Sequence, residues 1–346
     1  MSHLTLTGAG KSGAGITATY TVTTTGAQTH TINSFGVSAA TVVDWGDGST
    51  STYNGTALRT HNYAGAGTWL VTIYKPQNVT VFDMRDGKVN LNSADIASMV
   101  NVTHVVLTAL RSGRFDSADV SAWRPTTFHL YSMPAGYAGR FDSADVSDWR
   151  PTNFDLHSMP AGYAGTFDSA DVSDWRPTYF LLYSMPAGYA GTFDSADVSA
   201  WRPANFYLYS MPAGYAGTFD SADVSAWRPA NFYLCSMPAG YSVTAGGGWA
   251  NWITTTDFQV QSNGLLTATV DAILWELYQA TLARTATGGT INVGGTNQAP
   301  SGVFQAASAC PVSAATSGKE IAHELLNDGC DAIAAGKTWA TVTITA

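Results

Sequence analysis

The chain has 346 residues, enough for two or three domains with a sizeable core. Only 12% of the residues are charged, and the net charge of −9 argues against nucleic acid as a partner, because phosphate binding needs clusters of Lys and Arg. No run approaches the ~18 consecutive apolar residues of a membrane span, so membrane insertion is not expected.

The N-terminal part is predicted to consist of short β-strands. Two Thr-rich strands are expected over residues 16–24 and 29–34. A further strand ends in the Trp-Gly-Asp-Gly turn of residues 45–48, which is followed by His-x-Tyr at 61–63 and Gly-Thr at 67–68. These motifs resemble the hallmark of PKD-type immunoglobulin-like domains.

The resemblance implies a β-sandwich over residues 1–77 with a spacer or adhesion role. Two of its acidic residues, Asp44 and Asp47, allow two interpretations. They are either a calcium-binding pair or carboxylates that form the turn, and turn formation is much the commoner role.

A 26-residue unit occurs five times in tandem between residues 113 and 242. A period of this length is typical of solenoids, whose repeats bury their core against their neighbours. Each copy keeps a Phe and a Leu two positions later, such as Phe128 and Leu130, while the residues before, between and after them vary. This period of two predicts a β-strand with the constant residues inward and the variable residues outward.

The variable residues predict an outward ribbon roughly 20–25 Å long, because stacked strands lie ~4.8 Å apart. Neutral drift on a solvated surface is one interpretation of this ribbon. Its Tyr and His residues favour a recognition surface instead, since they offer large contact areas at low cost in entropy, and rings on adjacent coils are expected to stack into one platform. The predicted ligand-binding residues are His129, Tyr131, Asp155, His157, Leu181, Tyr183, Tyr207, Tyr209 and Tyr233.

A second segment of each copy contains repeated carboxylates. Asp116, Ser117 and Asp119 predict a capped 3₁₀ turn before Trp123, which is expected to lie in the core. We interpret these Asp residues, beside Arg124 and its counterparts, as a capping and ion-pair spine, with a calcium spine as the alternative. Glycosidase chemistry needs two carboxyl groups in unlike environments, which identical copies do not supply. Since no nucleophile elbow or metal-ligand spacing occurs either, we expect no enzyme activity, cofactor or metal.

The unit resembles the leucine-rich-like repeats of BspA-type and mycoplasma-lipoprotein surface proteins, which also place Asp-Val-Ser-x-Trp before the strand. The resemblance covers residues 89–242. It implies a leucine-rich-like parallel β-solenoid over residues 78–242, with a first strand at 79–84 and a degenerate entry turn at 91–96. With only Phe and Leu as strong inward residues, each coil is expected to be flatter than in leucine-rich horseshoes.

The C-terminal region, residues 243–346, predicts the order strand–helix–strand–helix–strand and a βα cap on the open end of the solenoid. Thr267 is expected to cap the first helix, and Ser317 with Glu320 to form a capping box for the second. This region resembles the C-terminal part of leucine-rich-like tail and surface proteins of phages and their bacterial hosts.

Three cysteines are too few for a disulfide scaffold. Cys235 is expected on the exposed side of the last repeat strand. Cys310 and Cys330 flank the second helix and are compatible with a disulfide or with two reduced thiols. Their spacing fits no zinc motif.

These resemblances together imply a mainly β, non-enzymatic surface protein. Met1–Thr5 lacks the features of a signal peptide, which favours a phage virion protein, such as a tail fibre, over an exported bacterial adhesin. We expect it to bind a host-surface glycan or protein through the ribbon and to contact other virion proteins, with oligomerisation left open. A bacterial cell-surface adhesin is the first alternative, and a polysaccharide depolymerase is the second.

Overall fold

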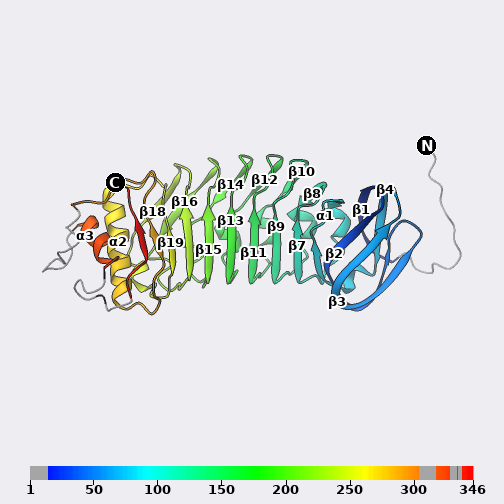
Figure 1. Cartoon of the computed structure of the whole chain (residues 1–346), viewed down its shortest axis with the longest axis horizontal. Coiled ribbons are helices and arrows are strands. Elements are labelled where there is room, and N and C mark those ends of the chain that lie inside the picture. Colours follow the sequence, from blue (N-terminus) through cyan, green and yellow to red (C-terminus); the bar gives the residue numbers. More distant parts are fainter. Residues whose placement is uncertain (1–14, 304–316, 328–332, 334–336, 346) are drawn as a thin grey trace.

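A computed structural model describes residues 15–303, 317–327, 333 and 337–345. The protein is mainly β, with a long, unclosed sheet of mostly parallel strands arranged in repeats. Figure 1 shows the N-terminal strands at one end of an elongated molecule, the helices α2 (Thr267–Leu282) and α3 (Gly318–Glu324) at the other, and the stacked repeats between them.

The N-terminal part consists of antiparallel strands. Strand β1 pairs with β4 and strand β2 with β3, both antiparallel. The strand predicted at 29–34 and the one predicted to end in the Trp-Gly-Asp-Gly turn belong to a single long strand, β2. Register shifts after Ile32 and Val37 let the chain bend without ending its pairing. The strands are β1 Thr17–Thr25, β2 Gln28–Asp44, β3 Thr50–Tyr63 and β4 Ala66–Tyr74.

The Trp-Gly-Asp-Gly turn is held by its own carboxylates. Asp44 Oδ1 accepts a hydrogen bond from the Gly46 amide at 3.0 Å, and Asp47 Oδ1 accepts one from the Ser49 amide at 3.0 Å. Gly46 has φ +82°, and a Cβ there would lie 2.6 Å from the Leu70 carbonyl oxygen, so glycine is required. The turn-forming interpretation of Asp44 and Asp47 is confirmed, and within the described ranges no cluster of ligands suits a metal ion.

The sheet continues across the predicted boundary at residue 77. Strand β5 (Val79–Met84) pairs with β2, and strand β6 (Val89–Asn92) pairs with β1, both antiparallel. Each of these two strands is then the first of a series of parallel strands. Helix α1 (Ser93–Ile96) forms the predicted entry turn. The N-terminal strands are thus hydrogen-bonded directly onto the first coil, with only the 3₁₀ turn Pro76–Asn78 between β4 and β5.

Two series of parallel strands run along the repeats. In the first series, successive strands pair with a shift of one repeat, so that Phe128 lies opposite Phe154 and Phe154 opposite Phe180. The first series consists of β5, β7 His104–Thr108, β9 Thr127–Tyr131, β11 Asn153–His157, β13 Tyr179–Tyr183, β15 Asn205–Tyr209, β17 Asn231–Cys235, β19 Asp257–Gln259, β20 Thr290–Asn292 and β21 Thr341–Thr343. The second series consists of β6, β8 Ser112–Asp116, β10 Tyr137–Arg140, β12 Tyr163–Thr166, β14 Tyr189–Thr192, β16 Tyr215–Asp220 and β18 Tyr241–Thr244.

The constant residues of the first series of strands form the core, as predicted. Every repeat Phe and Leu of these strands is fully buried, and so is every repeat Trp. Ring centroids of Phe154 and Phe180 are 5.6 Å apart, and Trp175 lies 5.1 Å from Phe154. Each Phe therefore packs on the equivalent Phe and on the Trp of the next coil. The contact recurs along the molecule because each repeat carries the same two residues.

The repeated serines and aspartates form a ladder between coils. Ser143 Oγ donates to Asp171 Oδ2 of the next coil at 2.5 Å and accepts from the Asp168 amide at 2.8 Å. The same two bonds recur at Ser117, Ser169 and Ser195. The predicted 3₁₀ turns are confirmed in three copies, at Ser117–Val120, Ser143–Val146 and Ser169–Val172.

The predicted capping and ion-pair spine is wrong in its partners. Asp116 occupies the N-cap position, but its side chain makes no capping bond there. Its counterpart Asp142 instead accepts from the Thr166 amide of the next coil at 2.8 Å. Arg124 donates to the carbonyls of its own turn and pairs with Asp148, not with the ladder. Asp142 thus joins two coils through a backbone N–H group, and Asp116 and Asp142 also pair with Arg114 and Arg140 of their own coils.

The C-terminal region follows the predicted order β19–α2–β20–α3–β21, with all three strands parallel. The capping box of Ser317 and Glu320 is confirmed. Thr267 does not cap α2, because the N-cap position is Leu266, and the Thr267 amide instead donates to Gln298 Oε1 at 3.0 Å. Cys310 and Cys330 lie outside the described residues.

The Ser–Asp ladder ends on helix α2. Ser221 has no Asp in the following coil, where Trp249 stands at the equivalent position. Glu276 takes that place: its carboxylate accepts from Ser221 Oγ at 2.9 Å, from the Gly247 amide at 2.6 Å and from the Trp249 amide at 2.8 Å. Burial raises the pKa of Glu276, although these donors oppose the rise.

Candidate ligand-binding ribbon

The nine predicted residues form one continuous surface, which we call the ribbon, on the outward side of strands β9, β11, β13, β15 and β17. They fall into two rows, because each strand contributes one residue between its Phe and Leu and one after the Leu. All nine are partly buried rather than fully exposed, since neighbouring coils cover them from both sides. The first row is His129, Asp155, Leu181, Tyr207 and Tyr233, and the second is Tyr131, His157, Tyr183 and Tyr209.

The second row is an unbroken stack of four rings. Tyr131 and His157 are 4.8 Å apart between centroids and 12° from parallel. His157 and Tyr183 are 4.2 Å apart, and Tyr183 and Tyr209 are 4.4 Å apart, both nearly parallel. The predicted stacking is confirmed, and it has a consequence for binding. The faces between these rings are occupied by one another, so a ligand on this row meets ring edges, hydroxyl groups and the His157 imidazole.

The first row is interrupted in the middle. Tyr207 and Tyr233 stack at 4.5 Å, and the Tyr233 hydroxyl donates to the Asp257 carboxylate. Asp155 and Leu181, which stand between His129 and Tyr207, carry no ring. Their shorter side chains leave a gap in the row.

A hollow of about 280 Å³ opens at this gap. Its lining consists of His129, Asn153, Phe154, Asp155, Tyr179 and Leu181, and we call it the Asp155 hollow. Tyr179 is 47% exposed, and among the described residues no other ring stacks on it, because Asn153 and Asn205 flank it in its register. The ring faces of Tyr179 are therefore free of aromatic contacts among the described residues.

Asp155 is an unusual carboxylate for an outward position. Its Oδ1 lies 3.4 Å from His157 Nε2 but is not aligned for a hydrogen bond, so this buried oxygen has no such partner within the described part of the chain. Burial raises the pKa of Asp155 to about 7, and it lowers the pKa of His157 to about 4. The pKa of His129 is lowered as well, again mainly by burial. The surroundings of Asp155 and of the two neighbouring imidazoles thus disfavour charge of either sign.

Sequence reasoning did not include Asn153 and Tyr179 among the site residues. The signal was present, because the position before the constant Phe varies among the copies as the ribbon positions do. Its register places it on the same face as the two rows, since residues two apart on a strand point the same way.

The expectation for Cys235 is wrong, because its thiol is buried rather than exposed. It follows Tyr209 in the second row, where a short side chain is covered by the larger neighbours. Burial raises the pKa of Cys235 to about 11, which makes a reactive thiolate unfavourable at neutral pH.

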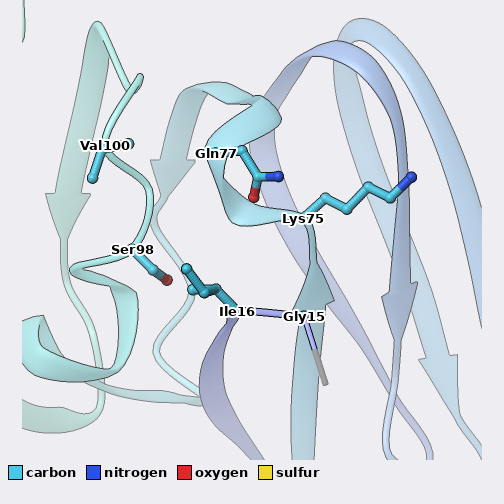
Figure 2. A pocket seen from close by; sticks show the side chains of 6 residues that line it. All are labelled: Gly15, Ile16, Lys75, Gln77, Ser98 and Val100. Carbon is cyan, nitrogen blue, oxygen red and sulfur yellow. The ribbon is translucent and has the colours of Figure 1, made fainter. Parts of the chain in front are cut away.

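A second cavity, of about 580 Å³, lies at the junction of the N-terminal strands with the first coils. It is lined by Gly15, Ile16, Lys75, Gln77, Ser98 and Val100. Figure 2 shows Ile16 and Ser98 beside one another, while the Lys75 amino group extends away from them. Polar groups do not converge there as in a ligand site, and Gly15 directly follows residues that the structure does not describe, so the ribbon remains the stronger candidate.

No helix within the described residues is long and apolar enough to cross a membrane. Comparisons of the chain with protein-family models, with curated proteins and with solved structures gave no match. The ribbon is therefore identified by its own geometry and by the variation among the five copies.

Proposed function

We propose that this protein is a non-enzymatic surface protein of a phage particle, a tail fibre or similar appendage, which binds a glycan or protein of its host through the ribbon. One observation carries the proposal. Five nearly identical repeats differ chiefly at positions that fall on one face, where their Tyr, His, Asp and Leu side chains form a contiguous surface. Aromatic residues gathered in this way are typical of recognition surfaces.

The two ends of the molecule fit this role. We infer that the N-terminal strands form a PKD-type sandwich that spaces the solenoid from other virion proteins. The inference is supported by the antiparallel pairing and by Trp45, which is buried, stacked on His61 at 4.8 Å and bonded through its carbonyl to the Tyr63 hydroxyl at 2.9 Å. We also infer that α2 and α3 cap the last coil, since Glu276 supplies the acceptor that a further repeat would supply.

The same ribbon also suits a bacterial cell-surface adhesin, because either context places it opposite a foreign surface. A depolymerase is not favoured. The carboxylates of the repeats are engaged in the ladder, and Asp155 stands on the ribbon without a second carboxylate among the residues that line its hollow.

The test is binding of the purified, fluorescently labelled full chain to a panel of bacterial strains. We expect saturable binding to at least one strain, competed by unlabelled chain, and no new reducing ends when the chain is incubated with surface polysaccharide from that strain. Absence of saturable binding across the panel would refute a role in host recognition, and new reducing ends would favour the depolymerase.

A further inference from the structure

We propose that the Asp155 hollow binds one neutral pyranose ring of a surface glycan, with Asp155 as hydrogen-bond acceptor and Tyr179 as the stacking ring. The inference rests on the proposed function of the ribbon and narrows its ligand from a glycan or protein to a sugar. The side chains that carry it come from three adjacent strands, β9, β11 and β13.

The first step concerns the unpaired oxygen of Asp155. A buried acceptor without a donor is costly, and a ligand that donates a hydrogen bond to it removes that cost. Sugar hydroxyl groups are such donors. Asp155 lines an open hollow, and rotation of its carboxylate group turns the buried Oδ1 toward a ligand that enters from solvent.

The second step concerns Tyr179. A pyranose presents a face of C–H groups that packs on an aromatic ring, and this contact needs a ring whose face is free. The stacked rings of the second row do not offer one, whereas Tyr179 is about half exposed and lines the same hollow as Asp155. Leu181 adds an apolar wall between them, and Asn153 adds an amide on the other side.

The third step concerns the charge of the ligand. Asp155 keeps its proton more readily than an ordinary carboxyl group, while His129 and His157 lose theirs more readily than ordinary imidazoles, and burial is the first cause in each case. A site that disfavours both signs of charge suits a neutral ligand that makes hydrogen bonds. At about 280 Å³ the hollow has room for a single ring and not for a folded peptide segment.

The experiment is saturation-transfer NMR on the full chain with the methyl glycosides of glucose, galactose, mannose and N-acetylglucosamine. Two variants use residues that the repeats already carry at these positions. Asp155→Leu copies Leu181 of the next coil, and Tyr179→Asn copies Asn153 and Asn205 on either side, so both are compatible with the fold. We expect at least one glycoside to bind the parent, and each variant to bind it at least tenfold more weakly.

The control is Asp148→Ala, which also removes one carboxylate and copies the Ala found at this position in other repeats, at a site 77% exposed and away from the ribbon. It should bind like the parent. Failure of all four glycosides to bind the parent, or undiminished binding by both variants, would overturn the inference. So would equal loss in the control. Thermal melting identifies any variant that fails to fold, and Tyr179→Asn, at an exposed position, then decides.

Failure of the sugar site is distinguishable from failure of the proposed function. If cell binding needs the ribbon but no glycoside binds, the ligand is not a pyranose in this hollow, and a host protein becomes the expected ligand. If a glycoside binds through Asp155 but ribbon variants still bind cells normally, the hollow is a sugar site and the ribbon is not the host receptor site.

Discussion

The two faces of strand β13 differ in what the architecture demands of them. Phe180 and Leu182 point inward, are fully buried, and recur at the same positions in all five copies. Tyr179, Leu181 and Tyr183 on the same strand point outward and differ from their counterparts. In a solenoid each inward residue packs on its own copy, so a change in one repeat spoils two contacts. Outward residues need only fit beside their neighbours, which leaves them free to diversify for binding.

The contrast is not complete, because part of the outward face is also packed. The four-ring stack of the second row covers much of its own surface, and Asp155 behaves as a buried group. Where the outward face is packed, stability should respond to mutation. Where it is open, only binding should respond.

The largest expected effect separates the two faces directly. Phe180→Ala opens a cavity between two coils and should lower the free energy of unfolding by about 3–5 kcal/mol. Leu181→Ala, on the same strand but outward and partly exposed, should cost less than about 1 kcal/mol. Urea denaturation of both variants checks this. Equal losses would mean that the two faces are packed alike, which would remove the contrast between them.

The second prediction concerns Asp155 and pH. Its pKa is raised from 3.8 to about 7, so the folded state binds this proton more tightly than the unfolded state. The stability from that proton is complete below about pH 4 and is lost as pH rises to about 7. Asp155→Asn, which stays neutral, should therefore be about 2–4 kcal/mol more stable than the parent at pH 8 and nearly equal to it at pH 4, because one pKa unit corresponds to about 1.36 kcal/mol.

Denaturation of parent and variant across this pH range measures the difference. Asp148→Asn is the matched control, since it makes the same change at a carboxylate that is largely exposed and away from the ribbon. A variant that follows the parent at every pH would show that Asp155 is not buried in solution.

The third prediction, with a smaller expected effect than the first two, tests the end of the ladder. Glu276→Gln keeps the shape but turns one acceptor oxygen into a donor facing Ser221 Oγ and a backbone N–H. We expect a loss of about 1–2 kcal/mol. Asp171→Asn makes the same change in the middle of the ladder and should cost a similar amount. A neutral outcome for Glu276 alone would argue that α2 does not cap the solenoid.

Much of the repeat architecture was predictable from the sequence. Five copies in one chain reveal which positions are constant, and the period of two at Phe128 and Leu130 identifies the inward face without further information. The capping box at Ser317 and the turn carboxylates of residues 44–47 were predictable because their partners lie within a few residues.

The errors concern partners that lie far away in sequence. The Ser–Asp ladder joins residues about one repeat apart, and identical copies do not reveal which neighbour each side chain reaches. Glu276 lies 55 residues after Ser221 on a helix with no repeat to compare. The burial of Cys235 depends on the size of the neighbouring side chains. The Asp155 hollow arises because short side chains lie next to one another on two adjacent coils, which the sequence of one strand does not show.

The central claim is that the ribbon binds the host surface. Replacing Tyr183, Tyr207 and Tyr209 by Ser removes three ring edges and hydroxyl groups from both rows and leaves Phe180, Phe206 and their core unchanged. Loss of ring stacking should lower stability by roughly 1–3 kcal/mol, and cooperative melting should persist.

The decisive measurement is binding of this triple variant to the strain that binds the parent, made well below the melting temperature of the variant. We predict at least a tenfold weaker affinity, which corresponds to about 1.4 kcal/mol and is modest for three aromatic residues at an interface. A folded triple variant that binds the cells as tightly as the parent would contradict a role of the ribbon in host binding.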